Sequence, residues 1–440
     1  MGLGISQFIP YIIYGSSFLV ILISLFKPAI GVLFLFPLLP YQVIFEKIKH
    51  LPMGNNVNDF IILSVLLGTF INGKKGKQFS EEKTEIEVPI VLICLSTFIG
   101  VLIALSQSGG LSAQSGTYIA DWKNYMLLPL IWFLTFKNIE NKKTFNLMLL
   151  ILMIGILGAA YYFYTNLQWL NTWHYSNRTR TMMEGLFVYL GPNHYGAFYA
   201  NFVFIAFGLF FYEKKLLRKG CLIGIICLTI YSLVYTYSRG AYIALIAGFL
   251  LLGAIKERKL LILLALFLIF WRALVPISVV ERVDMTHQED GELEDSAAIR
   301  IGLWQAATRM FTESPLIGRG FNTFQYTFKG EVWKDTHNYY LKVLVELGIL
   351  GLISFIMFLI AAFKVGWKLY SEAPDGIFKG LGLGFFLCVL SVAITNFFGD
   401  RWTFLSLGSY FWIFLGLVSR ARIMVKSGIC QSEIKHKTKR

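Results

Sequence analysis

Apolar runs long enough to cross a lipid bilayer recur along nearly the whole chain, and they limit the fold more than any other feature. At a rise of about 1.5 Å per residue, a helix needs roughly 20 apolar residues to span a hydrocarbon core of about 30 Å. With 56% hydrophobic residues among 440, the chain has more apolar side chains than a soluble core buries. We therefore predict an all-α, polytopic membrane protein.

The apolar runs divide into about thirteen predicted transmembrane segments, with twelve as the alternative. The segments at 56–72 and 123–136 are the weakest. The first segment has no basic cluster before it and no small-residue cleavage site after it, so we expect a retained span. The predicted segments are 9–26, 28–45, 56–72, 88–106, 123–136, 144–164, 186–211, 220–237, 240–255, 259–275, 337–363, 377–398 and 402–419.

Lysine and arginine clusters determine the predicted orientation, because basic connections stay on the cytoplasmic side. They lie within 74–77, 137–143, 214–219, 256–259, 364–368 and 420–440. The predicted external connections are 107–122, 165–185, 238–240, 276–336 and 399–401. The resulting regions are transmembrane helices in 1–275, one large external loop in 276–336, C-terminal transmembrane helices in 337–420, and a basic, unstructured cytoplasmic tail in 421–440.

The formal charge of +14 reflects this topology. The loop 276–336 holds ten acidic residues and six basic ones, so the positive charge lies on the predicted cytoplasmic side. Contact with anionic lipid accounts for it, and nucleic acid is not an expected partner. The five cysteines show no disulfide or metal-ligand spacing, and we predict no metal site.

The stretch "THNYYLKVLVELGILGL", residues 336–352, places polar residues at the start of an apolar helix. We predict a cap at Asp335 or Thr336, with His337 in the first turn. The positive helix end there favours the neutral imidazole, which can accept a proton from a hydroxyl. The alternative is an interfacial capping histidine. Lys342 and Glu346, four residues apart, are expected to neutralise each other.

Two arginines lie in predicted external segments. Arg239, in "YSRGAYIALIAG", falls in so short a connection that it must lie at the outer surface, where it can bind a fixed anion or reach lipid phosphate. Arg300 lies in a predicted amphipathic surface helix that ends at Ser314. Its expected apolar side consists of Ala297, Ala298, Ile301, Trp304, Ala307 and Phe311.

Another polar stretch is "LGPNHYGAFYANF", residues 190–202. Pro192 is tolerated in a first helical turn, which places Asn193 and His194 at the outer mouth of a span. A helix cap with an interfacial histidine is the alternative interpretation. Upstream, "NTWHYSNRTR" adds Arg178 and Arg180 beside aromatic residues typical of a membrane interface.

Taken together, these motifs resemble the O-antigen ligase and Wzy-type polysaccharide polymerase superfamily. The resemblance rests on "SRGA", on "RIGLW" leading into "SPLIGRGFNTF", and on "HN" followed by "GILG", and it is strongest over residues 190–352. It implies a GT-C-like glycosyltransferase whose donor is an undecaprenyl-diphosphate-linked oligosaccharide. His337 would be the catalytic base, and Arg239 and Arg300 would bind the diphosphate.

Further substrate-binding candidates follow from position rather than from a firm motif: Asn338, His194, Arg319, Arg401, Arg178 and Arg180. No cofactor is implied, and the sequence contains no Asp-x-Asp motif of the kind that binds a divalent cation with a sugar nucleotide. Expected partners are the lipid-linked donor, a glycan acceptor and membrane lipids. A flippase and a chain-length regulator are further candidates.

The expected function is metal-independent, inverting polymerisation of repeat units outside the bacterial cytoplasmic membrane. Leu352 and Ile353 follow Gly351 where ligases often have threonines, which favours a polymerase. The alternative within the superfamily is a ligase that transfers a finished glycan to a lipid or protein. A lipid-linked oligosaccharide flippase should show related halves and ionisable residues within several spans, and neither pattern is evident here. A scaffold subunit of an export complex is the remaining alternative.

Overall fold

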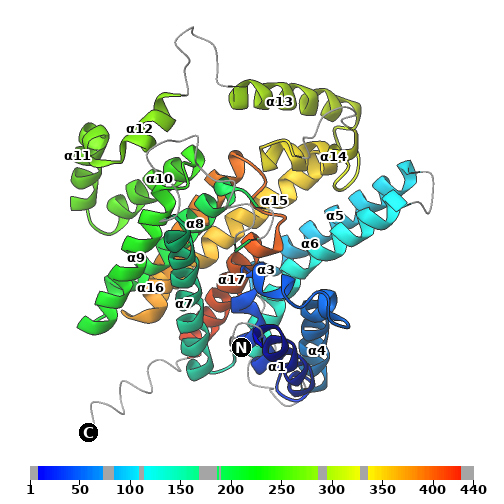
Figure 1. The fold of residues 1–440 in the computed structure, drawn as a ribbon, viewed down its shortest axis with the longest axis horizontal. Helices are drawn as coiled ribbons and strands as arrows, with labels where there is room; N and C mark the ends of the chain where they lie inside the picture. The colour runs from blue at the N-terminus through cyan, green and yellow to red at the C-terminus, as the bar shows by residue number, and fades with distance from the viewer. Residues whose placement is uncertain are drawn as a thin grey trace, which may run out of the picture.

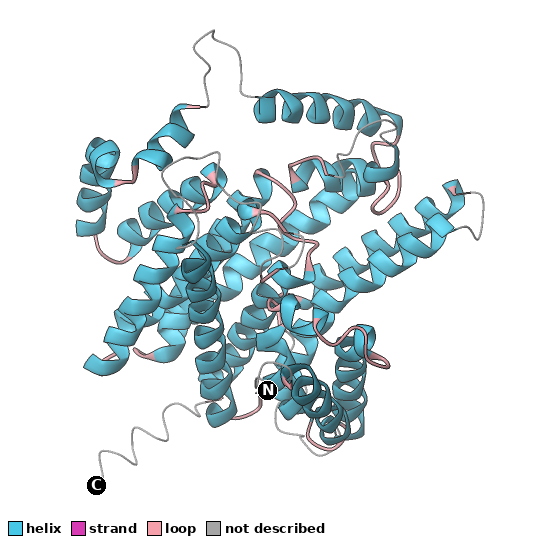
Figure 2. Ribbon diagram, in the orientation of Figure 1, coloured by secondary structure: helices cyan, strands magenta, loops and turns pink. Residues whose placement is uncertain are grey.

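The computed structural model describes residues 8–72, 84–108, 113–167, 186–187, 190–285, 295–327 and 335–427, and these residues form helices joined by loops (Figures 1 and 2). The predicted all-α class is confirmed. The α-helices are α1 (Ile9–Ser24), α2 (Pro28–Leu35), α3 (Gln42–Glu46), α4 (Val57–Asn72), α5 (Glu87–Gln107), α6 (Ala113–Asn138), α7 (Lys142–Leu167), α8 (Pro192–Tyr212), α9 (Leu216–Val234), α10 (Arg239–Ile255), α11 (Lys259–Leu274), α12 (Ile277–Asp284), α13 (Asp295–Glu313), α14 (Phe324–Thr327), α15 (Tyr339–Glu372), α16 (Ile377–Phe397) and α17 (Leu405–Lys426).

Each predicted transmembrane segment overlaps one of these helices. Among the described residues, seven helices are long and apolar enough to cross a membrane, or up to eight if the bent pair α11 and α12 is one span. Shorter apolar helices are Ile9–Ser24, Pro28–Leu38 and Arg239–Ile255. The polytopic membrane class is therefore confirmed, whereas the total of about twelve or thirteen spans stays a prediction.

The helices α8, α15, α16 and α17 form the centre of the bundle. Nearly all of α17 is buried, and glycines bring α16 close to its neighbours. A Cβ on Gly208 of α8 would lie 2.2 Å from the Gly380 carbonyl oxygen of α16, and one on Gly382 would lie 2.5 Å from the Tyr370 amide nitrogen of α15. Small residues allow membrane helices to pack this closely, so α16 is a rigid support for the loop that follows it.

The helix α15 is broken at Gly348, where φ is 66° and ψ is −168°. Residues 315–320, here called the strap, run along the break and pair with its backbone. The Arg319 amide donates to the Val345 carbonyl at 2.9 Å, and the Ile349 amide donates to the Pro315 carbonyl at 2.9 Å. Backbone groups without partners are costly in an apolar environment. The strap supplies hydrogen-bond partners to the backbone groups that the break leaves without intrahelical bonds. Part of the motif "SPLIGRGFNTF" thus has a structural role.

Lys342 and Glu346, predicted to neutralise each other, influence each other electrostatically, but each has its direct partner on another element. The Lys342 ammonium lies 2.9 Å from the Asp400 carboxylate, between α16 and α17. Glu346 instead accepts hydrogen bonds from the backbone amides of Asn322 at 2.9 Å and Phe324 at 3.3 Å. Spacing along a helix identifies shared faces, but both side chains found partners on other elements.

Two further predictions about helices need correction. The inward face of α13 includes Leu303, Ala307 and Met310. Of the expected apolar side, Ala307 is buried and Phe311 packs against it, whereas Ile301 is 41% exposed, so the buried face is rotated somewhat from the expected one. The last helix does not end near residue 420 but continues to Lys426. The rest of the predicted unstructured tail, from residue 428 on, lies outside the described residues.

Candidate active site

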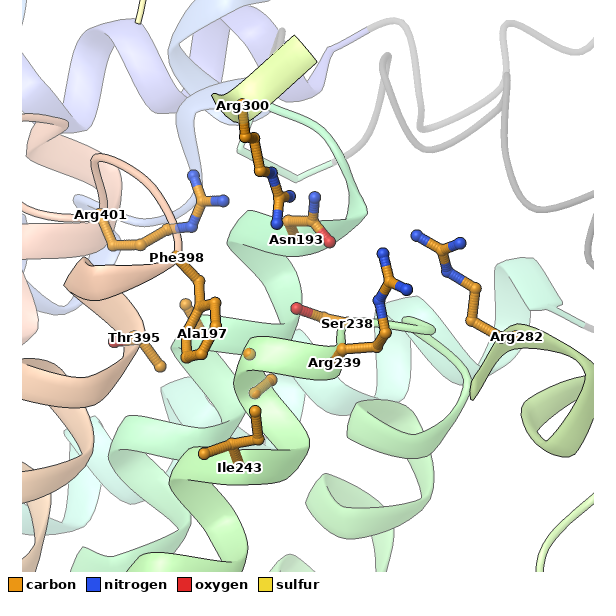
Figure 3. A pocket seen from close by; sticks show the side chains of 12 residues that line it. Asn193, Ala197, Ser238, Arg239, Ile243, Arg282, Arg300, Thr395, Phe398 and Arg401 are labelled. Atoms are coloured by element: carbon orange, nitrogen blue, oxygen red, sulfur yellow. The ribbon is translucent and has the colours of Figure 1, made fainter. Parts of the chain in front are cut away.

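A cavity of about 280 Å³ lies where the helices α8, α10, α12, α13 and α16 meet the α16–α17 loop. Its wall includes four arginines, one each from α10, α12, α13 and the α16–α17 loop, and their guanidinium groups extend toward the same space (Figure 3). We call Arg239, Arg282, Arg300 and Arg401 the arginine cluster. The remaining lining residues are Asn193, Ala197, Ser238, Gly240, Ala241, Ile243, Thr395 and Phe398.

Arg239 reaches the cavity because the connection before it is tight. The helix α9 ends at Val234, Tyr237 adopts a left-handed backbone conformation with φ of 53°, and Ser238 precedes α10 in an extended conformation. Arg239 is thus the first residue of α10, whereas the sequence predicts it in the short connection before that helix. The next residue, Gly240, lets α10 approach Phe398, because a Cβ there would lie 2.7 Å from the Phe398 side chain.

Arg282 is the member of the cluster that the sequence analysis did not single out. It lies on α12, which bends by 102° from α11 at Pro276. Its side chain is only 5% exposed. The sequence pattern could have indicated an inward position for Arg282, since Ser278, Val279 and Arg282 are spaced to share one helix face. The structure buries all three residues.

Arg300 and Arg401 occupy the other part of the cavity (Figure 3). Arg300 lies one turn before Leu303 on the inward face of α13, and the Trp304 indole of that helix donates to the Thr336 carbonyl at 3.1 Å. Arg401 is 7% exposed. Burial lowers the pKa of its guanidinium to about 10, which leaves it positively charged at neutral pH.

His194 of α8 supports Arg401 from behind. Arg401 donates to His194 Nε2 at 2.8 Å and to the Asp400 carbonyl at 3.0 Å. Since a guanidinium has only donors, His194 Nε2 must accept, and the imidazole is the neutral Nδ1–H tautomer. The expected place of His194, beside the first turn of a span that begins at Pro192, is confirmed.

Asp400 fixes the loop that carries Arg401. Its carboxylate accepts hydrogen bonds from the amides of Trp402 and Thr403, each at 3.0 Å, and pairs with Lys342. Burial opposes ionisation, but Lys342 and Thr403 outweigh it and lower the pKa of Asp400 below its usual value. The carboxylate is therefore charged at neutral pH and holds the loop against α15.

His337 lies just before α15 rather than in its first turn. Asn338 is the cap, and its side-chain oxygen accepts from the amides of Tyr340 at 3.0 Å and Leu341 at 3.3 Å. His337 has a left-handed backbone with φ of 51°, and Thr336 closes this turn by donating to the Asn338 carbonyl at 2.6 Å. The predicted cap at residue 335 or 336 was wrong because asparagine caps helices as well as aspartate and threonine do.

The surroundings of His337 favour the neutral imidazole that the sequence predicts, and the main cause is burial rather than the helix end. Burial lowers the pKa of His337, and Arg300 and Arg401 lower it further, whereas Asp335 opposes them. Two members of the arginine cluster, Arg300 and Arg401, thus act on His337, although His337 itself does not line the cavity. An imidazole with a lowered pKa therefore lies near a strongly cationic cavity.

The remaining predicted site residues do not all meet there. Arg319 belongs to the strap, forms an ion pair with Glu313 and does not line the cavity. Asn338 is 3% exposed, and its side-chain oxygen is used for capping. Arg178 and Arg180 lie outside the described residues. The described part of the chain contains no group of three or more His, Cys, Asp or Glu side chains placed to hold a metal ion.

The charge of the cavity wall indicates what it binds. Among the described residues that line it there are four arginines and no carboxylate. Bringing like charges together is unfavourable, and an anion offsets that cost. Guanidinium groups match phosphate oxygens in geometry and charge and form hydrogen bonds about twice as strong as neutral ones. The cavity is therefore suited to a phosphate or diphosphate group.

Comparison with known families agrees with this chemistry. Residues 223–356, which include Arg239, Arg282, Arg300 and His337, match the family model described as O-antigen ligase. The match supports the O-antigen ligase and Wzy superfamily. O-antigen ligase or polymerase activity, a form of glycosyl transfer, is the general function that this superfamily supports. No curated protein matches the chain.

Proposed function

We propose that this chain polymerises polysaccharide repeat units, taking them from undecaprenyl-diphosphate-linked donors on the outer side of the bacterial cytoplasmic membrane. The observation that carries the proposal is the convergence of the arginine cluster on one cavity, two of whose arginines, Arg300 and Arg401, also act on the charge of His337. A saccharide diphosphate suits this arrangement, because its diphosphate gains negative charge as the sugar leaves. The outer location follows from the distribution of basic residues, which assigns every member of the cluster to an external connection or its edge.

In the proposed reaction, an acceptor hydroxyl attacks the anomeric carbon while the bond from that carbon to the diphosphate oxygen breaks. His337 accepts the hydroxyl proton, and the diphosphate keeps the bonding electron pair. This single displacement inverts the anomeric configuration. The arginine cluster stabilises the charge on the leaving oxygen, and removing one such fixed donor costs about 10²–10³ in rate. These residues supply the base and the charge stabilisation without a metal ion.

Substitutions in the chain test this assignment. His337→Ala and Arg300→Ala should each reduce polymer by at least about 10²-fold while the protein still inserts into the membrane. Arg309→Ala is the matched control, because Arg309 is exposed on the same helix as Arg300 and its loss should leave polymer unchanged. Retention of long-chain product by His337→Ala would refute the proposal.

A ligase is the second candidate, because the matching family model is described as O-antigen ligase. Leu352 and Ile353 after Gly351 favour the polymerase. A gel of the glycans from a deletion strain separates the two. Surface glycan limited to one repeat unit identifies a polymerase, whereas accumulation of lipid-linked polymer identifies a ligase.

A further inference from the structure

Asp335 holds a carboxylate next to the imidazole of His337. The distance from Asp335 Oδ2 to His337 Nδ1 is 3.7 Å. That is longer than a hydrogen bond, but contacts of a general base often tighten only when substrate is bound. The two residues belong to one short turn, so a small rotation of either side chain closes the gap.

The position of Asp335 is fixed from outside its own turn. The Asp400 amide donates to Asp335 Oδ2 at 3.2 Å, and the Trp304 indole donates to the carbonyl of the next residue, Thr336. The other carboxylate oxygen, Oδ1, is buried and has no hydrogen-bond partner among the described residues. Leaving a buried acceptor unpaired costs free energy, so such an oxygen calls for an explanation, of which a functional role is one.

We propose that Asp335 is the positioning residue of His337: its carboxylate accepts the Nδ1 proton and so turns Nε2 toward the acceptor hydroxyl. The inference rests on the proposed function, in which His337 is the base. When His337 takes the hydroxyl proton, Asp335 stabilises the resulting imidazolium and itself stays ionised. Loss of the carboxylate removes this contribution to the orientation and tautomer of the imidazole.

The surroundings of His337 make this carboxylate important. Arg300 approaches from α13, Arg401 from the α16–α17 loop and His194 from α8, and the two arginines oppose protonation of His337. Lys342 and Asp400 neutralise each other nearby. Asp335 is therefore the nearby anion that favours the imidazolium formed during transfer.

Asp335→Asn tests the inference with little structural change. Its carboxamide oxygen can still accept from the Asp400 amide, but the negative charge is lost. With lipid-diphosphate-linked donor and purified full-length protein, we expect kcat to fall by about 10²-fold, the lower end of what a general base contributes, with KM for the donor unchanged. The acid limb of kcat/KM should move to lower pH, because Asp335 raises the pKa of His337 in the native protein. Asp335→Glu should recover part of the rate.

The controls separate this inference from the proposed function. Asp121→Asn removes another partly buried carboxylate, which accepts from Asn322 at 2.6 Å, and should leave kcat and the pH profile unchanged. A native rate and acid limb in Asp335→Asn would overturn the positioning role alone. So would a lower rate with an unmoved acid limb and no recovery by Asp335→Glu. Full transfer by His337→Ala would overturn the proposed function and this inference with it.

Discussion

Replacing Lys342 by methionine should destabilise the protein more than any substitution of an exposed ion pair. Lys342 and Asp400 lie 2.9 Å apart, with side chains that are 12% and 2% exposed. Methionine fills the space of the lysine stem but removes its charge. The Asp400 carboxylate is then left buried without its cation, and its hydrogen bonds from Trp402 and Thr403 replace only part of the lost interaction.

The geometry sets the expected size of the effect. At 2.9 Å and an effective dielectric constant of about 20, the attraction between the two charges is about 6 kcal/mol. Desolvation of the pair cancels part of this gain, and removing one partner of a buried pair typically costs about 3–5 kcal/mol. We expect Lys342→Met to lower the free energy of unfolding by that amount. Adding Asp400→Asn should restore part of it, because the Asp400 carboxylate is then no longer buried without its cation, whereas Glu346 still lacks the nearby charge of Lys342.

The measurement is unfolding by titration of SDS into detergent micelles, followed by tryptophan fluorescence. Lys123→Met is the matched control, because Lys123 and Asp59 form a pair of similar length, 2.6 Å, with side chains that are 51% and 38% exposed. Exposed pairs contribute about 0–1 kcal/mol. If Lys342→Met is no more destabilising than Lys123→Met, or if the double variant is the least stable of the series, the assigned role of this ion pair is wrong.

Three other predictions follow from the site and from the broken helix. Arg282→Gln should raise the donor concentration for half-maximal transfer by about 10-fold, since hydrogen bonds to charged groups contribute about 1.5–3 kcal/mol. Arg272→Gln, at an exposed position, should leave that concentration unchanged, and equal titration curves for the two variants would contradict the role of Arg282. Gly348→Ala should destabilise the protein by at least about 1–3 kcal/mol, because the φ of residue 348 is 66° and a Cβ there would lie 2.3 Å from the Leu316 carbonyl oxygen of the strap. In the same unfolding assay, Gly302→Ala, which adds its methyl group on an open helix surface, should be neutral or stabilising. The rate of transfer should fall on acidification with a midpoint below pH 6.5, because burial lowers the pKa of His337 from that value and the neutral imidazole persists to lower pH. A pH–rate profile with a midpoint above 6.5 would rule out His337 as the titrating base.

The helices and the approximate location of the site could be predicted from the sequence because both depend on local signals. Hydropathy over about 20 residues defines a span, and basic connections identify its ends. Arg239, Arg300 and Arg401 lie in connections assigned to one side, so their convergence could be expected without coordinates. Arg282 was missed because the bend at Pro276 turns it toward the cavity. That bend lies in the predicted external loop 276–336, for which the count of charged residues gives no local structure.

Other features depend on contacts between distant segments and could not be derived from spacing. The partner of Lys342 lies 58 residues away on another element. The strap follows a helix break that "GILG" alone does not reveal, since glycine is also common within membrane helices. Similarly, Asn338 rather than Asp335 became the helix cap, which left Asp335 beside His337. In each case the sequence allowed more than one ion-pair partner or helix cap, and packing between distant segments determined which one formed.

The pairing of the strap with α15 limits how the protein can move. Arg300 and the strap lie on one continuous segment, and that segment is joined to α15 by hydrogen bonds on both sides of Gly348. A displacement of α15 along its axis would carry the surface helix α13 with it. The hydrogen bonds between the strap and α15 thus hold the distance between Arg300 and His337 nearly constant. If the cavity opens to admit the proposed glycan donor, we expect the movement on the side of Arg239 and Arg282.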